Sequence, residues 1–158
     1  MIQYDFETAG SVAAWQPVGS QIPPGVLTGL VQSTAAAHNG TGSLAMQFAG
    51  TYDPADSGTP ANPFYGIYMD YRLGVVPPPN TTVTLWVMAT APGASVGTYV
   101  QISPSWDWVG LTNTGVLPAG TWQQVTLTTP ANQIWYFGLQ TFTSLTYQGT
   151  IYLDQISW

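Results

Sequence analysis

The chain has 158 residues, of which 45% are apolar and only 5% are charged, whereas about 25% is usual in a globular domain. Its one basic residue, Arg72, stands against seven acidic residues, so the net charge is −6. One arginine cannot displace counterions from phosphates or anionic lipids, so nucleic-acid binding and polybasic membrane binding are excluded. The length predicts one domain over residues 1–158, and the absence of cysteine excludes disulfides and thiolate chemistry.

Short segments rich in β-branched and aromatic residues follow one another along the chain. Because 17 glycines and 13 prolines interrupt every long helical pattern, these segments predict strands. The densest turn signals, at 51–63 and 74–80, predict long rim loops. Ten short strands with turns between them predict an all-β fold, a β-sandwich or barrel. In chain order the predicted strands are 2–7, 26–32, 43–49, 64–72, 81–90, 97–103, 107–112, 121–129, 134–142 and 150–158.

In five of these segments, apolar core residues alternate with residues that face away from the core. These outward-facing residues are of two kinds. Opposite the core, residues 81–90 and 121–129 carry threonine, which predicts a plain solvated face. Residues 64–72, 97–103 and 134–142 carry aromatic, amide and charged side chains there instead. The two kinds alternate along the chain, and successive strands of a jelly roll cross between two packed sheets. We therefore expect a β-sandwich jelly roll of two antiparallel sheets, one of which gathers the aromatic and amide side chains.

The side chains on that face suit a neutral sugar, which presents apolar C–H faces and rings of hydroxyl groups. Any one aromatic residue is as often a core residue as a ligand-binding residue. Tyr99 and Tyr136, however, lie opposite positions of their strands that are already apolar. Asp70 and Arg72 could equally be an ordinary surface ion pair. The segment SPSWDWVG adds two large rings beside a carboxylate. The expected ligand-binding residues are Tyr68, Asp70, Arg72, Tyr99, Gln101, Trp106, Asp107, Trp108, Tyr136 and Gln140.

Catalysis is the minority interpretation, and we expect no enzymatic activity. A serine-hydrolase triad needs a basic partner, and the only histidine, His38, lies in a loop sequence without a nucleophile elbow. Glycoside hydrolysis needs two carboxylates, for which Asp70 and Asp107 are a conceivable pair. Asp53 and Asp56 lie among prolines and glycines, where turn chemistry accounts for them.

Two further acids predict a calcium site. Glu7 ends the first predicted strand, and Asp154 interrupts the apolar last strand, where an unpaired charge is costly. The chain has no lysine to pair with them, so Ca²⁺, which takes about six to eight oxygen ligands, is the expected partner. Asn39 and the backbone oxygens of residues 38–43 would supply further ligands. The alternative is that either acid is exposed or bonded to loop amides.

Seven segments resemble, in sequence and order, the jelly-roll carbohydrate-binding modules of plant-cell-wall polysaccharide hydrolases, the family-eleven type and its neighbours. The resemblance covers nearly the whole chain. It implies a non-catalytic module with a concave sheet that grips a polysaccharide, and a structural calcium held at Glu7 and Asp154. It also implies ligand contacts at Asp70 and Gln140, although the family pattern has an aromatic residue at the second position. The segments are YDFE, AHNGTGSLAMQF, YGIYMDYRL, VTLWVMAT, GTWQQVTLTT, IWYFGLQTF and GTIYLDQISW.

The expected function is binding of a soluble or amorphous β-linked polysaccharide of the β-glucan, xyloglucan or glucomannan class. An appended hydrolase would thereby be concentrated on its substrate. A surface solvated by Thr, Gln, Asn and Ser favours an extracellular module of a longer secreted chain, although the N-terminus lacks a signal sequence. Three alternatives stay open: a structural or adhesion sandwich of surface or phage-tail type, a lectin for cell-surface glycans, and a small glycoside hydrolase or lyase.

Overall fold

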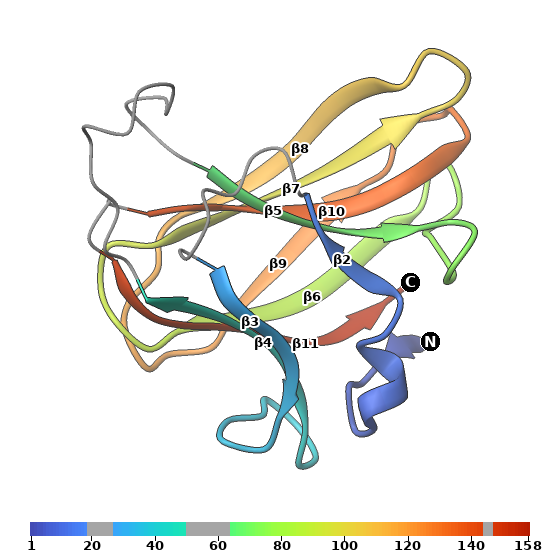
Figure 1. Ribbon diagram of the computed structural model, residues 1–158. Coiled ribbons are helices and arrows are strands. Elements are labelled where there is room, and N and C mark those ends of the chain that lie inside the picture. Colours follow the sequence, from blue (N-terminus) through green and yellow to red (C-terminus); the bar gives the residue numbers. More distant parts are fainter. Residues whose placement is uncertain (19–26, 50–63, 144–146) are drawn as a thin grey trace.

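The computed structural model describes residues 1–18, 27–49, 64–143 and 147–158. Across these ranges the chain forms two packed layers of strands (Figure 1), which confirms the predicted β-sandwich. Residues 74–80 form a loop, as expected, whereas the second predicted rim loop, 51–63, lies outside the described residues. No helix of the described ranges has the length and apolar character needed to cross a membrane.

The strands follow the predicted segments closely, with one addition. The short strand β2 was not predicted, because three residues that end in proline carry no alternation. A single 3-10 helix, η1 (Ala9–Ser11), precedes it in the described part of the chain. The strands are β1 (Ile2–Tyr4), β2 (Trp15–Pro17), β3 (Leu27–Ser33), β4 (Ser43–Ala49), β5 (Phe64–Asp70), β6 (Thr82–Ala89), β7 (Ser95–Ile102), β8 (Asp107–Val116), β9 (Gln123–Thr128), β10 (Ile134–Phe142) and β11 (Gln148–Ser157).

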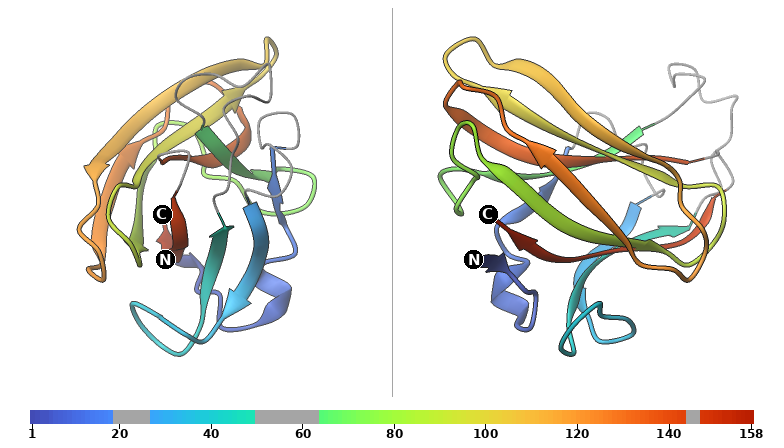
Figure 2. Two further views of the ribbon diagram at one scale, coloured as in Figure 1. Left: turned by 60° about the vertical axis from the view of Figure 1, so that its left-hand side comes forward. Right: turned by 180° about the vertical axis from the view of Figure 1, so that it is seen from behind.

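The strands divide between two antiparallel sheets, which Figure 2 shows as two layers. Sheet A has the order β3-β4-β11-β6-β9, with β1 paired to β11. Sheet B has the order β2-β5-β10-β7-β8. The strands with aromatic and amide side chains, β5, β7 and β10, are all in sheet B, and the threonine-bearing β6 and β9 are paired in sheet A. The predicted division of the two kinds of strand is confirmed.

The core lies between the sheets and determines what the outer faces display. Leu85 and Val87 of β6 and Phe137 and Leu139 of β10 are buried in one cluster. Burial of a side chain of this size contributes about 1.5–3 kcal/mol. Because successive side chains of a strand point to opposite faces, packing these residues inward forces their neighbours in sequence onto the outer faces.

The outer face of sheet A carries aromatic residues as well as the threonines that predicted a solvated face. Trp86 of β6 and Tyr152 of β11 also lie on it, and the loop at 34–42 crosses over them. The His38 ring of this loop stacks on Trp86, with ring centroids 3.7 Å apart and planes 13° apart. Ala36 of the same loop packs against the small cluster around Tyr152. The aromatic part of this face is therefore covered by the chain itself.

Candidate functional site

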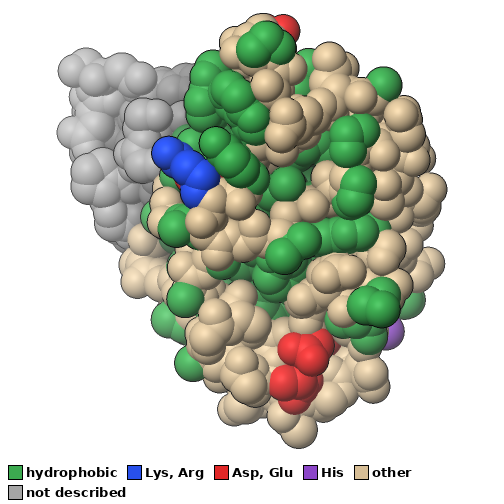
Figure 3. Space-filling model, turned by 90° about the vertical axis from the view of Figure 1, so that its right-hand side faces the viewer, with side chains coloured by type: hydrophobic (Ala, Val, Ile, Leu, Met, Phe, Trp, Pro, Cys, Tyr) green, Lys and Arg blue, Asp and Glu red, His purple; other side chains and the backbone are tan. Residues whose placement is uncertain are grey.

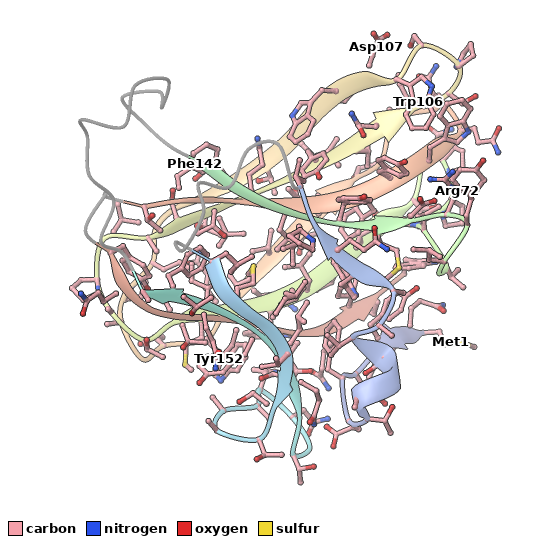
Figure 4. All side chains as sticks on the ribbon, in the orientation of Figure 1. Met1, Arg72, Trp106, Asp107, Phe142 and Tyr152 are labelled. Carbon is pink, nitrogen blue, oxygen red and sulfur yellow. The ribbon has the colours of Figure 1, made fainter. Side chains whose placement is uncertain are left out.

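Sheet B brings most of the expected site residues together on its outer face. The registers of β5, β10 and β7 align these side chains in rows across the sheet, and β8 extends them. Figure 4 shows Trp106, Asp107 and Arg72 at one end of this sheet and Phe142 at the other. The two rows nearest Arg72 are Asp70, Tyr136, Gln101 and Trp108, followed by Tyr68, Gly138 and Tyr99.

Asp70 and Arg72 form an ion pair where β5 ends. The Nε of Arg72 donates to both carboxylate oxygens, at 2.9 and 3.0 Å, and Nη2 donates to Oδ2 at 2.5 Å. These bonds hold the pKa of Asp70 below its ordinary value and raise that of Arg72. Asp70 is only 3% exposed, whereas the Arg72 side chain is largely exposed. The carboxylate thus holds the guanidinium in place and leaves it to face solvent.

A cluster of rings surrounds this ion pair. The rings of Tyr68 and Tyr136 lie 4.7 Å apart, centroid to centroid, and Trp106 stands edge-on to Tyr136 at 5.3 Å. Trp106 also contacts Trp135 at 4.1 Å, and Trp135 stacks on Tyr71 at 6.1 Å. In Figure 3 the only basic side chain of the chain lies beside hydrophobic side chains at this end of the sandwich. The site therefore combines a row of ring faces with one fixed cation.

Trp106 has an unusual backbone conformation. Its φ is +63°, in the left-handed region that bulky residues rarely adopt. Its backbone N–H donates to the carbonyl of Ile102 at 2.9 Å, and its ring packs on Trp135 and Tyr136. Such a conformation costs about 1–3 kcal/mol and persists only where the surroundings hold it. The result is a large ring, 45% exposed, held in a fixed position at the rim of the face.

Tyr99, which was expected to contact the ligand, is buried on the outer face of sheet B. The alternation placed it on the outer face, which is right, but its side chain is only 1% exposed. Trp108 of the edge strand β8 covers it. On the other side the Tyr99 ring lies over Gly138, where a Cβ would come within 2.4 Å of two ring carbons. Burial raises the pKa of the Tyr99 phenol. Tyr99 therefore supports Trp108, and Trp108, 38% exposed, presents the ring at the surface.

The remaining expected residues lie on the same face with different surroundings. Gln101 and Gln140 are half-buried, and Gln140 pairs across the sheet with Gly66 and Gly97. Asp107 is exposed and accepts a hydrogen bond from the Ser105 hydroxyl. Both amides are thus partly accessible on this face, and Asp107 lies where β8 begins.

Three residues of this cluster were missed by the sequence reasoning. Alternation continued through residues 64–72 would place Tyr71 in the core beside Met69, but β5 ends at Asp70, and Tyr71 is exposed. Trp135 lies at a register shift of β10, where the alternation is interrupted. Gln16, on the unpredicted strand β2, accepts a hydrogen bond from the Tyr68 hydroxyl at 3.1 Å.

The arrangement does not support the hydrolase alternative. Asp70 ends β5 and Asp107 begins β8, and β10 and β7 lie between these strands. Three strand spacings place the two backbones about 14 Å apart, whereas glycosidase carboxylates are about 5 to 9.5 Å apart. His38 lies on the other sheet, stacked on Trp86, and its Nδ1 lies 3.0 Å from the Oε1 of Gln155.

Asp154, the first expected calcium ligand, is fully buried in β11. Its Oδ2 accepts the backbone N–H groups of His38, at 2.8 Å, and Asn39, at 3.2 Å. Its Oδ1 accepts the N–H of Gln155 at 2.7 Å. Burial raises the pKa of this carboxyl despite these bonds.

Glu7, the second expected calcium ligand, binds the loop at residues 34–42, the loop that also contains His38 and Asn39. Its carboxylate accepts the N–H of Thr41, at 3.0 and 3.1 Å, the Thr41 hydroxyl at 2.8 Å, and the N–H of Gly42 at 3.2 Å. The bond from the Thr41 hydroxyl, aided by the amides, lowers the pKa of Glu7. Gly40 lies directly beneath the carboxylate, since a Cβ there would overlap Oε1.

The two acids thus bind the loop at residues 34–42, which was expected to supply further calcium ligands. Their oxygens are the hard ligands that calcium prefers, and the only basic side chain, Arg72, is bonded to Asp70 on the other sheet. Four loop N–H groups already stabilise the carboxylates. The described residues contain no cluster of three or more His, Cys, Asp or Glu side chains that could hold a metal, so an ion would also need backbone oxygens and Asn39. Calcium binding stays a prediction.

No protein-family model and no curated protein sequence matches the chain. Solved structures do match it. One, from a study of the promiscuous specificity of β-sandwich carbohydrate-binding modules, superposes over 99% of this chain with a TM-score of 0.73 and 20% identity. The chain spans 61% of that structure's chain. The protein has the fold of the β-sandwich carbohydrate-binding modules.

Two further matches widen this comparison. The CBM27-1 module of Caldicellulosiruptor saccharolyticus, in complex with mannohexaose, has a TM-score of 0.70 at 12% identity, over 98% of this chain and 94% of that one. The K1 cleaved adhesin domain of Lys-gingipain from Porphyromonas gingivalis W83 has a TM-score of 0.68 at 20% identity, over 98% and 95%. The resemblance to carbohydrate-binding modules is confirmed for the fold, and the narrower family-eleven likeness stays a prediction.

Proposed function

We propose that the protein is a non-catalytic carbohydrate-binding module that binds a neutral β-linked polysaccharide on the outer face of sheet B. The observation that carries this proposal is the exposed ring of Trp106, held in a left-handed backbone conformation beside Arg72 and Tyr136. Strain of this kind is concentrated at functional sites. A large ring fixed at the surface gives the apolar face of a sugar something to stack on.

The rings and the polar groups have separate tasks in this proposal. The faces of Trp106, Trp108 and Tyr68 take the C–H faces of the sugars and supply most of the affinity, because a few aromatic anchors usually dominate a binding energy. Arg72 and the amides of Gln101 and Gln140 bond the hydroxyl groups and so select their positions. An uncharged ligand suits a chain whose net charge is −6.

The proposed ligands are β-glucan, xyloglucan and glucomannan. The structural relative that holds mannohexaose supports a neutral oligosaccharide on this fold. The proposed setting is extracellular, where such polymers are found, and the proposed partner is an appended hydrolase that the module concentrates on its substrate.

Adhesion is the second candidate function. The likeness to the adhesin domain of Lys-gingipain, which covers nearly all of both chains, favours it. An adhesion domain would bind a protein or a cell-surface glycan, and would leave plant-type polysaccharides unbound.

Affinity electrophoresis and isothermal titration calorimetry against barley β-glucan, xyloglucan, glucomannan and xylan distinguish these functions. The proposal predicts retardation by at least one of the first three, and loss of that retardation in Trp106→Ala. Val31→Ala, an exposed apolar residue on β3 of the other sheet, is the matched control. Retardation by none of the four would overturn the proposal, and release of sugar from a bound polymer would show an enzyme instead.

A further inference from the structure

The hydrogens on Nε and Nη2 of the Arg72 guanidinium are all donated to neighbouring side chains. A guanidinium has five N–H donors. The Nε–H donates to the carboxylate of Asp70. Of the two hydrogens on Nη2, one goes to Asp70 and the other to the hydroxyl of Tyr136, whose oxygen lies 3.2 Å away. Of the five N–H donors of Arg72, only the two on Nη1 make no hydrogen bond to any described residue.

This pattern decides which acceptors Arg72 can still bind. Arginine recognises a carboxylate with two parallel N–H bonds from one edge of the guanidinium. One such edge is formed by Nε and Nη2, and the other by Nη1 and Nη2. Both edges need Nη2, and both of its hydrogens are committed. What remains is Nη1, which can donate single hydrogen bonds to hydroxyl or ring oxygens.

The charge at the site points the same way. Asp70 neutralises the only basic side chain, and the rest of the chain is acidic. At physiological salt the Debye length is about 8 Å, so distant acids are largely screened and the local pair dominates. A sugar that carries a carboxylate therefore meets no unpaired positive charge at this site.

We propose that Asp70 is a specificity-determining residue that excludes uronate-bearing polysaccharides from the site and keeps Arg72 for neutral sugars. This inference rests on the proposed function and refines its ligand class. In it, Asp70 makes no direct contact with the ligand. It occupies the positions on Arg72 that a ligand carboxylate would otherwise take.

The test compares barley β-glucan with the same polymer after oxidation of its C6 hydroxyl groups to carboxylates. Binding is measured by calorimetry and affinity electrophoresis at low and at physiological salt, and the readout is the ratio of the two affinities. The unaltered protein should favour the neutral polymer. Asp70→Asn removes the charge with little change of shape, and should shift the ratio toward the oxidised polymer by about tenfold, the value of one exposed charge-assisted hydrogen bond.

Two variants control for net charge and for the source of the shift. Asp5→Asn changes the net charge by the same amount at an exposed acid far along the chain, where the side chain accepts the N–H of Glu7, and should leave the ratio unchanged. Asp70→Asn combined with Arg72→Gln should lose the shift. Tyr136→Phe releases one Nη2 hydrogen without touching the buried acid, and should move the ratio in the same direction if Asp70→Asn does not fold.

The outcomes separate this inference from the proposed function. Equal binding of the two polymers by the unaltered protein would overturn the exclusion, as would folded Asp70→Asn and Tyr136→Phe variants with unchanged ratios. If the unaltered protein binds neither polymer but Asp70→Asn gains the oxidised one, the exclusion holds and β-glucan is ruled out as the ligand. If no variant binds either polymer, both proposals fail for β-glucan.

Discussion

Tyr99 lies flat beneath Trp108, with ring centroids 3.6 Å apart and planes inclined by 11°. The stack joins a buried ring of the inner strand β7 to a surface ring of the edge strand β8. It rests on Gly138 of β10, the residue whose missing side chain leaves room for Tyr99. A glycine in the middle of a strand weakens the strand, and here it makes the ring platform possible.

Gly138→Ala should therefore destabilise the protein. The added Cβ would lie 2.4 Å from two carbons of Tyr99 and 2.5 Å from the backbone oxygen of Ile67, which cannot move aside within the sheet. Overpacking of this kind typically costs about 1–3 kcal/mol. Urea unfolding measures the loss, and Gly110→Ala in β8, where a Cβ meets nothing within 4 Å, is the control. Equal stability of the two variants would show that the Tyr99 ring does not rest on Gly138.

Trp106→Gly should separate binding from stability. Glycine adopts the positive φ of this position without strain, which offsets part of the loss of the ring contacts with Trp135 and Tyr136, so Trp106→Gly should melt at a higher temperature than Trp106→Ala, which retains the strain. The ring that we assign to sugar stacking is lost, so affinity for the polysaccharide should fall by about tenfold or more. Thermal melts and calorimetry measure the two effects. A variant that binds with unaltered affinity would remove Trp106 from the site.

The Asp70–Arg72 pair predicts a loss of stability in acid. The folded protein lowers the pKa of Asp70, chiefly through its hydrogen bonds to Arg72. The pair therefore stabilises the fold above the unfolded pKa of about 3.9, and this contribution is lost as the pH falls through the lower folded value. Asp70→Asn should flatten that part of the profile, which urea unfolding at a series of pH values between 5 and 2, about that pKa, would show. A slope as steep as that of the unaltered protein would contradict it.

Removal of calcium is the fourth test. If Glu7 and Asp154 hold the ion, EDTA should lower the melting temperature, and added Ca²⁺ should restore it. Asp154→Ala should melt at the same temperature with and without EDTA, because the buried ligand is gone. Asp5→Asn, which keeps both proposed ligands, should retain the EDTA effect. Identical melts of the unaltered protein with and without chelator would refute a structural ion.

The division of the strands between two sheets could be predicted because it depends on local patterns. Alternation in β6 and β10 places Leu85 and Leu139 in the core, and turn residues mark the strand ends. The type of side chain opposite the core then assigned each strand to its sheet. These signals lie within a few residues, so one sequence suffices to find them.

The composition of the site was less predictable, because it depends on neighbours from other strands. Alternation places Tyr99 on the outer face, but only the β7–β8 pairing shows that Trp108 covers it. Likewise, the threonines of β6 predicted a solvated face, and its Trp86 was not recognised as part of an aromatic contact, because its partner His38 lies far away in sequence. Trp135 escaped notice because a register shift interrupts the alternation at that point.

The loop that covers Trp86 and Tyr152 limits how many polymer chains one molecule can hold. Exposed rings for stacking lie on sheet B, whereas on sheet A residues 34–42 stack His38 on Trp86 and pack Ala36 against the cluster around Tyr152. Under the proposed function the described residues therefore offer one stacking face, on sheet B, which makes the module monovalent. It would coat a polysaccharide without bridging two chains, so a mixture of the two should stay fluid and not gel.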